Sequence, residues 1–403
     1  MSSSVAPIRS TASGEPCGPA TDLPHVTIVA QAVGDSPGAR FGGTNAQVAA
    51  LVEGYLDAGG AVTLICRESI IAHRPRLTVR RLRVPSRPSL LGSPLFIIAA
   101  SLAVARHGRG LIHSTGALVV SKVDVITVHF CHAAYADRSL PSRAARQNVW
   151  YRLHAWVVLR MNVMMERWCY RPAKARALVG PSQGVVDELA RHFPAAGNKA
   201  RVIHNGIDHQ RFSSVASSER EMCRREVHIP DEALAAVFVG GDWHRKGLDK
   251  AIRALASAPP WRLLVVGEGD RSEFEALADS FDVSNRVRFL GRRPDVERVY
   301  AAGDAFVFPS EYETFSLVTF EAAASGLPLL VSKISGIEEL VVEGDNGWFV
   351  SSSEDIARRL ALLADDPSLR AQMAAAARAS SAPYTWPSIV AGYAQLYSEL
   401  AGG

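Results

Sequence analysis

Two glutamates separated by seven residues are the strongest candidates for chemistry in this sequence. Glu313 and Glu321 enclose the run Thr-Phe-Ser-Leu-Val-Thr-Phe, which follows an apolar stretch and a Pro-Ser turn. We expect Glu313 in a loop that enters a helix and Glu321 within that helix. Eight helical residues rise about 12 Å, comparable to the reach of a pyrophosphate between a hexose and a ribose. The spacing alone also fits two glutamates on an ordinary helix surface.

The backbone between the two glutamates predicts an anion site. The first amides of a helix lack partners within the helix and lie at the positive end of its dipole. The residues expected to present such amides to a bound phosphate are Thr314, Phe315, Ser316, Leu317 and Val318. Together with the glutamates, this strand-loop-helix unit would bind a sugar, a pyrophosphate and a ribose in a row.

A basic loop precedes another predicted helix. His244, Arg245 and Lys246 follow the apolar run 236–240, so they lie near the carboxyl end of a strand. Cations placed there can stabilise the charge that grows on a departing diphosphate. We assign Arg245 and Lys246 to this catalytic role, and the alternative is a loop whose charges simply face water.

The elements that must position these residues alternate between strand and helix. Short apolar strands separated by helices indicate a parallel sheet covered on both faces, and ligands of such sheets lie beyond the carboxyl ends of the strands. In the second half of the chain, strands are predicted at 236–240, 262–267, 286–290, 305–308 and 327–331, and helices at 247–256, 272–281, 294–302 and 316–325.

The first half repeats this pattern less regularly. Strands are predicted at 26–30, 61–66, 110–113, 123–129, 177–181 and 200–203, and a helix at 44–58. The apolar run 90–105 is interrupted by Gly92 and Pro94, so we interpret it as a buried helix and not as a membrane span. The fold class expected is α/β, with two doubly wound, Rossmann-like domains facing across a cleft.

Composition favours a folded chain of two domains. The 403 residues are 48% hydrophobic and carry a formal net charge of only +4, so no nucleic-acid partner is predicted. The five cysteines are scattered and include no CxxC pair, which favours a cytoplasmic chain without disulfides. Residues 1–23 lack the apolar stretch of a secretory signal and are predicted to be a disordered tail.

The segment 138–176 is both basic and aromatic. It holds nine Arg or Lys residues against one acid, Glu166, and three of the seven tryptophans. Its apolar residues recur with a helical period at 149, 153, 156, 157, 161, 164 and 168. Two interpretations stay open: a core helix with a solvated basic face, or a helix on an anionic membrane surface. The second would make the protein peripheral on the inner face of the cytoplasmic membrane.

Further motifs are individually weak but occur in a specific order. They are Gly42-Gly43, Pro181-Ser182, His204-Asn205-Gly206-Ile207-Asp208, Lys246-Gly247-Leu248-Asp249, Val266-Gly267-Glu268-Gly269, Val287 to Gly291, Asp304 to Ser310, and Ala323 to Pro328. With the glutamate pair, they make the sequence resemble the family 4 glycosyltransferases, a large retaining group with the GT-B fold. The resemblance covers most of the chain from Val26 onward and is densest from Ala177 to Val350.

The resemblance implies further roles in the N-terminal half. Gly42 and Gly43 resemble the glycine loop that approaches the donor phosphate or the acceptor. His129 resembles the histidine that lies beside the transferred sugar, with His113 and His132 as nearby competitors.

In the C-terminal half, the resemblance is imperfect at one position. The basic loop follows the predicted strand 236–240, which ends in a glycine. In the family, an arginine often comes directly after this glycine, but here that position is Gly241. We infer that Arg245 takes over the guanidinium role. Gly267 matches the loop beside the nucleotide base.

The implied organisation is an acceptor-side domain over 24–205 and a nucleotide-sugar-binding domain over 206–383. Residues 384–403 are predicted to form a helix that can return to the N-terminal domain. No cofactor and no metal are expected, because the chain lacks an Asp-x-Asp triplet and a cationic loop with a helix dipole can replace a metal.

The implied activity is retaining transfer of a hexosyl group from a nucleotide-diphosphate sugar. A UDP-sugar is the favoured donor, and the acceptor is a hydroxyl of a glycan, a lipid-linked sugar or a polysaccharide precursor. The alternatives are another GT-B reaction on a nucleotide sugar, of the epimerase or phosphorylase type, and a non-catalytic nucleotide- or carbohydrate-binding protein.

Overall fold

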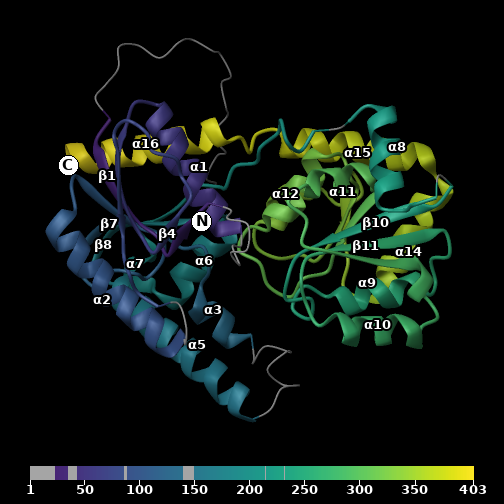
Figure 1. Ribbon diagram of the computed structural model, residues 1–403, viewed down its shortest axis with the longest axis horizontal. Coiled ribbons are helices and arrows are strands. Elements are labelled where there is room, and N and C mark those ends of the chain that lie inside the picture. The colour runs from purple at the N-terminus through teal and green to yellow at the C-terminus, as the bar shows by residue number, and fades with distance from the viewer. Residues whose placement is uncertain (1–22, 35–42, 86–88, 139–148, 214, 231) are drawn as a thin grey trace, which may run out of the picture.

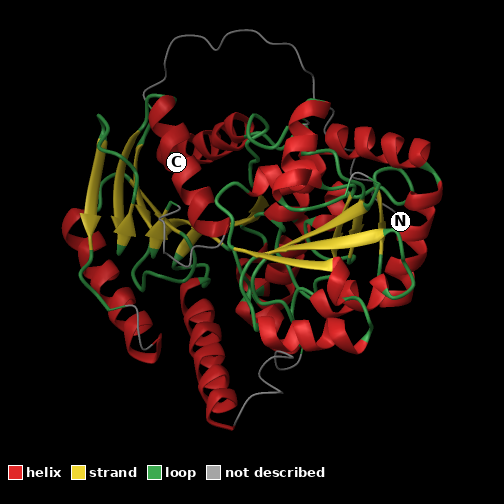
Figure 2. Cartoon of the chain, turned by 45° about the vertical axis from the view of Figure 1, so that its right-hand side comes forward, coloured by secondary structure: helices red, strands yellow, loops and turns green. Residues whose placement is uncertain are grey.

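The two halves of the chain fold as two α/β domains. A computed structural model describes residues 23–34, 43–85, 89–138, 149–213, 215–230 and 232–403. Each domain has a parallel β-sheet, and helices flank both sheets in two views of the molecule (Figures 1 and 2). This architecture confirms the predicted fold class.

The first sheet has seven parallel strands in the order β5-β3-β1-β6-β7-β8-β9. The strands are β1 (His25–Val29), β3 (Ala61–Cys66), β5 (Leu77–Arg81), β6 (Leu111–Ser114), β7 (Val123–Thr127), β8 (Ala175–Gly180) and β9 (Ala200–Val202), and a separate short pair is formed by β2 (Ala32–Val33) and β4 (Glu68–Ser69). The described helices of this domain are α1 (Gly43–Asp57), α2 (Ser89–His107), α3 (His132–Asp137), α5 (Val149–Cys169), α6 (Gln183–His192) and α7 (Pro194–Gly197).

The second sheet has six parallel strands in the order β12-β11-β10-β13-β14-β15. The strands are β10 (Leu234–Val239), β11 (Trp261–Val266), β12 (Val287–Gly291), β13 (Ala305–Phe308), β14 (Leu329–Val331) and β15 (Gly347–Phe349). The helices are α8 (Ser217–Glu226), α9 (Leu248–Leu255), α10 (Arg271–Ser280), the short 3₁₀ helix η1 (Ser284–Arg286), α11 (Val296–Ala302), α12 (Leu317–Ala324), α13 (Ile337–Leu340), α14 (Ser353–Asp365) and α15 (Pro367–Ser381).

Both sheets reverse their strand order at a central strand. β1 lies between β3 and β6, and β10 lies between β11 and β13. Open α/β sheets bind their ligands in the crevice that such a reversal creates at the carboxyl ends of the strands. The loops after β10 and β13 carry Arg245, Lys246 and Glu313, so the fold places these three residues at that crevice.

The last helix, α16 (Trp386–Gly402), crosses from the second domain and packs against the first sheet (Figure 1). Tyr393 and Tyr397 of α16 are buried in the same core cluster as β1 and β3. The ring of His113 on β6 is bonded through Nδ1 to the Tyr397 hydroxyl at 2.6 Å and through Nε2 to Thr127 Oγ1 at 2.7 Å. His113 is therefore a structural residue that fastens α16 to the N-terminal domain.

The prediction of a helix over residues 90–105 is confirmed, but the expectation that this helix is buried is wrong for one of its faces. The segment is helical as α2, and Phe96 and Ala100 are fully buried against the domain core. One face of α2 is exposed, however, with relative exposures of 61% at Leu91 and 56% at Ile98. Leu95 and Leu102 lie on the same exposed stripe. Sequence hydrophobicity did not distinguish a helix buried all round from one that keeps an apolar face outside the core.

Helix α5 also exposes apolar residues, and it projects from the lower edge of the molecule in Figure 1. The predicted stripe is largely on the surface: Leu153, Trp156, Met164 and Trp168 are all exposed. Val163, Glu166 and Cys169 form the buried face instead. The interpretation of this stripe as a core-packing face is therefore wrong for most of its members. Residues 139–148 of the basic segment lie outside the described residues.

Candidate active site

The loop between β13 and α12 carries Glu313, and α12 carries Glu321. The helix begins at Leu317, after Ser316 at a φ of +67°. The residues between Glu313 and Leu317 are therefore not helical, and the helical rise expected between the two glutamates applies only from Leu317 to Glu321. The amides of Leu317 and Val318 lie in the first turn, where a helix leaves its N–H groups without intrahelical partners.

The other three residues of the predicted amide site, Thr314, Phe315 and Ser316, precede the helix. Phe315 is buried and its ring stacks on Phe320 at 4.0 Å between centroids. Its side chain is thus a core anchor that holds the loop against α12. The backbone of Thr314 contacts the other domain, because its carbonyl oxygen accepts a 2.7 Å hydrogen bond from Ser182 Oγ.

Two cations converge on one oxygen of Glu313. Glu313 Oε1 lies 3.2 Å from Nη1 of Arg245 and 3.3 Å from Nζ of Lys246. The hydroxyl of Ser310 donates to the same oxygen at 3.2 Å. The Lys246 ammonium also lies 4.6 Å from the centre of the Phe308 ring, where the negative face of the ring attracts a cation.

Burial and charge pairing act in opposite directions in this cluster. Burial acts to raise the pKa of Glu313, but Lys246 and Arg245 outweigh it and hold this pKa below its ordinary value. Burial lowers the pKa of Lys246, and the Glu313 carboxylate opposes that effect. The Arg245 charge also lowers the pKa of Lys246, so the Glu313 carboxylate is the group that favours the charged form of this buried lysine. The cluster therefore presents two positive charges to one ionised carboxylate, and all three side chains are largely buried.

Arg245 is fixed by a second carboxylate. Its Nε donates to Asp242 Oδ2 at 3.1 Å, and Nη1 donates to the carbonyl oxygen of Tyr312. Asp242 has a φ of +52°, and its Oδ1 is buried with no hydrogen-bond partner among the described residues. An unpaired buried carboxylate oxygen is costly, so a donor from a bound ligand would stabilise this loop.

Glycines allow the loops after β10 and β11 to approach closely. Gly240 has a φ of +150°, and a Cβ there would lie 2.5 Å from the Lys246 side chain. A Cβ at Gly267 would lie 2.2 Å from the carbonyl oxygen of Gly240. Gly241 is exposed beside them. At Gly240 and Gly267 a side chain would collide with these neighbours, so glycine is what allows the ends of the two strands to lie this close.

Glu321 sits four residues into α12. Its Oε2 accepts a 3.1 Å hydrogen bond from the hydroxyl of Tyr300 on α11. Burial and the Glu321 charge raise the pKa of Tyr300 far above its ordinary value, so this hydroxyl stays protonated and acts as a donor. Tyr300 thus orients the carboxylate. No sequence pattern predicted this contact, because the two residues lie on different helices.

His129 meets the Glu313 loop across the two domains. Thr314 Oγ1 donates to the carbonyl oxygen of His129 at 2.8 Å. Burial lowers the pKa of His129 to about 4, so the imidazole is neutral at physiological pH. The other candidate in this stretch is His132, whose Nδ1 lies 2.7 Å from Oε1 of Glu166. We therefore assign His132 a structural role.

The structure therefore brings together part of the predicted site. Arg245, Lys246 and Glu313 are in contact, and the backbone of His129 touches the loop that carries Glu313. Gly42 lies outside the described residues, and Gly43 begins α1. Residues that sequence reasoning missed are Ser310, Asp242 and Tyr300. Only Ser310 had a visible signal, since it lies three residues before Glu313 at the start of the same loop.

Two models of glycosyltransferase families match the chain, one in each domain. Residues 41–211 match the family model described as Glycosyltransferase Family 4, and residues 219–380 match the model described as Glycosyl transferases group 1. The chain belongs to the family 4 glycosyltransferases, as the sequence motifs indicated.

Relatives of known name and structure agree with this assignment. A D-inositol 3-phosphate glycosyltransferase of Corynebacterium glutamicum is 31% identical over 56% of this chain and 57% of its own length. The solved structure of WaaG, a glycosyltransferase involved in lipopolysaccharide biosynthesis, superposes with a TM-score of 0.77 at 22% identity, covering 93% of this chain and 99% of WaaG. The structure of Anabaena HepE in complex with UDP-glucose superposes with a TM-score of 0.72 at 19% identity, covering 93% of this chain and 100% of HepE. Alignments to the first curated relatives span 54–62% of their lengths.

Proposed function

We propose that this protein transfers a hexosyl group from a nucleotide-diphosphate sugar to an acceptor hydroxyl, with retention of the anomeric configuration. The observation that carries the proposal is the convergence of Lys246 and Arg245 on Glu313, beside the first turn of α12. Two cations and free helix amides at the crevice of a doubly wound sheet suit a diphosphate. The family to which the chain belongs supports this reaction class.

In the proposed mechanism the C-terminal domain binds the donor. Glu321 accepts hydrogen bonds from the ribose hydroxyls, and Glu313 accepts from hydroxyls of the donor sugar. Lys246, Arg245 and the amides of Leu317 and Val318 stabilise the charge that grows on the departing diphosphate. Because these groups are in place before the bond breaks, they cost little reorganisation during the reaction.

The acceptor approaches from the N-terminal domain. Its hydroxyl attacks the anomeric carbon on the face that the diphosphate leaves, and the leaving phosphate takes the hydroxyl proton. This front-side route retains the anomeric configuration and needs no enzyme nucleophile. The neutral imidazole of His129 contacts the transferred sugar or the incoming hydroxyl as a hydrogen-bond partner.

A UDP-sugar is the favoured donor, and the HepE complex with UDP-glucose supports this choice. The acceptor is a glycan, a lipid-linked sugar or a polysaccharide precursor. Involvement of WaaG in lipopolysaccharide biosynthesis supports a cell-envelope acceptor, whereas the name of the Corynebacterium relative supports an acceptor that carries a phosphate.

Docking on an anionic membrane surface is part of the proposal. The exposed apolar faces of α5 and α2 are joined by the loop around Val120: Trp168 Nε1 donates to the Val120 carbonyl oxygen, and Ser101 Oγ accepts from the Val120 amide. Two cations lie over the Trp168 ring, Arg171 at 4.5 Å and Lys174 at 5.0 Å. Apolar side chains flanked by cations suit the boundary between acyl chains and anionic headgroups.

A ligand panel tests the donor assignment. UDP-, GDP-, ADP- and dTDP-sugars are compared by thermal shift, because a ligand at 100 times its Kd stabilises the folded state by about 2.7 kcal/mol. We expect stabilisation by one nucleotide class, with UDP-sugars first. Absence of stabilisation by every nucleotide sugar at millimolar concentration would contradict the proposed function.

A further inference from the structure

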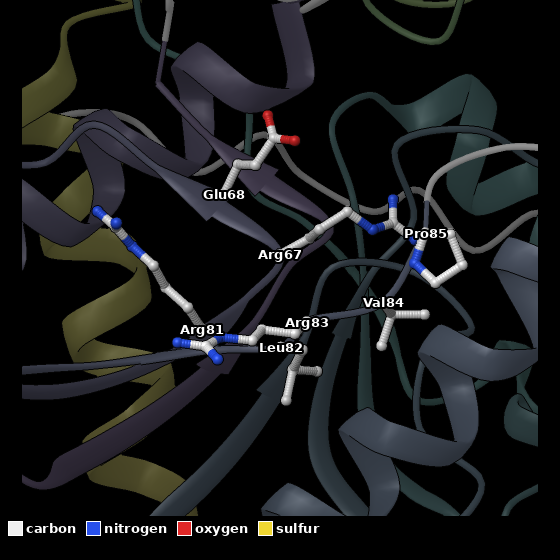
Figure 3. Close-up of a pocket in the computed structure, with 7 residues that line it drawn as sticks. All are labelled: Arg67, Glu68, Arg81, Leu82, Arg83, Val84 and Pro85. Carbon is white, nitrogen blue, oxygen red and sulfur yellow. The ribbon is translucent and has the colours of Figure 1, made fainter.

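A cationic pocket lies in the N-terminal domain, away from the donor cluster. It has a volume of about 640 Å³ and is formed where the chain leaves β3 and β5. The residues that line it are Arg67, Glu68, Arg81, Leu82, Arg83, Val84 and Pro85. Figure 3 shows Arg67 extending toward Val84 and Pro85, with Arg81 and Arg83 on the opposite side. The lining therefore carries three positive charges and one negative charge.

The three arginines are not neutralised within the described parts of the chain. None of them forms an ion pair with a described carboxylate, and the carboxylate of Glu68 points away from Arg81 and Arg83 (Figure 3). Arg81 donates one hydrogen bond, from Nη2 to the Ser69 carbonyl oxygen at 3.1 Å. With three positive charges against the one carboxylate of Glu68, the lining keeps an excess of positive charge, so an anion bound here reduces the repulsion between the arginines.

Arg67 is the most constrained of the three. Its guanidinium carbon lies 5.0 Å from the centre of the Phe96 ring on α2, and its Nε is buried with no hydrogen-bond partner among the described residues. Burial lowers the pKa of Arg67, yet a guanidinium stays charged in proteins. A buried N–H of a charged group without an acceptor is costly. The contact with Phe96 keeps the guanidinium in this position although its Nε–H has no acceptor. Such an arrangement is expected where a bound ligand supplies the acceptor.

We propose that the pocket of Arg67, Arg81 and Arg83 binds a phosphate group of the acceptor. The inference rests on the proposed glycosyl transfer and adds the chemical class of its acceptor. Guanidinium groups match phosphate oxygens with paired N–H donors, which gives both strength and orientation. Arg81 and Arg83 are exposed, and their long side chains can rotate onto a phosphate that Arg67 holds from the other side.

The position of the pocket decides which part of the acceptor carries the phosphate. Arg67 follows β3 and His129 follows β7, so both lie at the carboxyl edge of the same parallel sheet. Three strand spacings separate β3 from β7 in the order β3-β1-β6-β7, which is about 14 Å. That span exceeds one sugar ring. The phosphate therefore belongs to the end of the acceptor remote from the reacting hydroxyl.

A second groove continues from the pocket along α2. It shares Arg81 and Leu82 with the pocket, has a volume of about 480 Å³ and is lined further by Ala99, Leu102 and Arg106. The exposed apolar stripe of α2 begins beside it. A phosphate in the pocket can thus come from a soluble phosphorylated glycan or from a lipid whose chain follows α2. Both sources share the chemistry that the arginines recognise.

Phosphate binding is measured with inorganic phosphate by isothermal titration calorimetry. The titration uses a Lys246→Ala background, which weakens binding at the donor cluster. Adding Arg81→Gln and Arg83→Gln should weaken phosphate affinity more than tenfold. The matched control, Arg225→Gln with Arg288→Gln, removes two exposed charges from the second domain and should change affinity less than twofold. No phosphate binding before the pocket substitutions, or equal loss in both pairs, would overturn the proposal.

Two further probes identify the source of the phosphate. Glucose 6-phosphate represents a soluble phosphate ester, and phosphatidylglycerol vesicles, compared with phosphatidylcholine vesicles, represent a lipid phosphate. The pocket substitutions should weaken binding of one of these probes, and loss of neither would overturn the proposal. Failure of the unsubstituted protein to bind any nucleotide sugar would instead remove the proposed function while leaving phosphate binding at the arginines intact.

Discussion

The ammonium nitrogen of Lys246 lies 3.3 Å from Oε1 of Glu313, and both side chains are largely buried. The carboxylate that is assigned to the donor sugar thus also holds the cation that is assigned to the diphosphate. Placement of the sugar and stabilisation of the leaving group are coupled through one ion pair. Loss of either partner should therefore affect the chemical step more than donor binding.

Replacement of Lys246 by alanine tests this coupling. The charge on the diphosphate grows as the bond breaks, so the cation contributes most in the transition state. We expect kcat to fall about 10²–10³-fold, with a smaller change in donor KM. Lys250→Ala, in the first turn of α9, is the matched control and should leave both constants near their original values. An unchanged kcat in Lys246→Ala would exclude the leaving-group role.

The ribose assignment of Glu321 predicts the opposite pattern. Glu321→Gln keeps the size of the side chain but removes its charge, and charge-assisted hydrogen bonds contribute about 1.5–3 kcal/mol. Donor KM should rise about tenfold or more while kcat changes less. Tyr300→Phe should give a smaller rise, because it removes only the hydroxyl that orients the carboxylate. If Glu321→Gln has the same donor affinity as the control Glu338→Gln, the assignment is wrong.

Membrane docking predicts salt-sensitive binding to vesicles. Each basic residue near an anionic bilayer contributes about 1 kcal/mol, and salt screens this attraction. The protein should co-sediment with phosphatidylglycerol vesicles at low ionic strength and dissociate as salt is added. Arg152→Glu with Arg167→Glu on α5 should abolish co-sedimentation, whereas Arg225→Glu with Arg288→Glu in the second domain should not. If the protein does not bind anionic vesicles at any ionic strength, the membrane proposal is wrong, and the exposed faces of α2 and α5 would have to contact another partner.

Acid should destabilise the fold through His113. Burial, assisted by the nearby His129, lowers the pKa of His113 to about 3, whereas the unfolded chain takes up this proton near pH 6.5. The unfolded state binds more protons between these values, so stability is present above pH 6.5 and falls as the pH drops toward 3. Between pH 7 and pH 5 the His113 contribution to the free energy of unfolding should decrease by about 2 kcal/mol. Urea unfolding at both pH values checks this, because His113→Gln should show a smaller decrease than the original chain. An identical decrease in both would contradict the linkage.

Much of the fold followed from local patterns. Five strands of the second sheet, β10 to β14, are short apolar runs that begin or end within a few residues of their predicted positions, whereas β15 was not predicted. Arg245, Lys246 and Glu313 could be placed at one edge because the carboxyl ends of parallel strands meet there. The fold class needed only the alternation of elements, which the sequence carries directly.

What the sequence did not show depends on contacts between distant segments. The exposure of Leu91 and Ile98 depends on how α2 packs on its sheet, and hydrophobicity alone does not encode it. Helix α12 begins at Leu317 and not earlier, because Ser316 takes a left-handed conformation. The arginine pocket lies where β3 and β5 end side by side. Arg67 is distant in sequence from Arg81 and Arg83, so only the pairing of the two strands shows that these residues share a pocket.

Release of nucleoside diphosphate without a metal tests the central claim most directly. The account holds that Arg245, Lys246 and the first turn of α12 do the work that a metal ion does in other glycosyltransferases. With the nucleotide sugar selected by thermal shift and an acceptor present, EDTA-treated protein should release the diphosphate at the rate of untreated protein. Lys246→Ala should lower that rate about 10²–10³-fold. Complete loss of release in EDTA, restored by Mn²⁺ or Mg²⁺, would contradict the account.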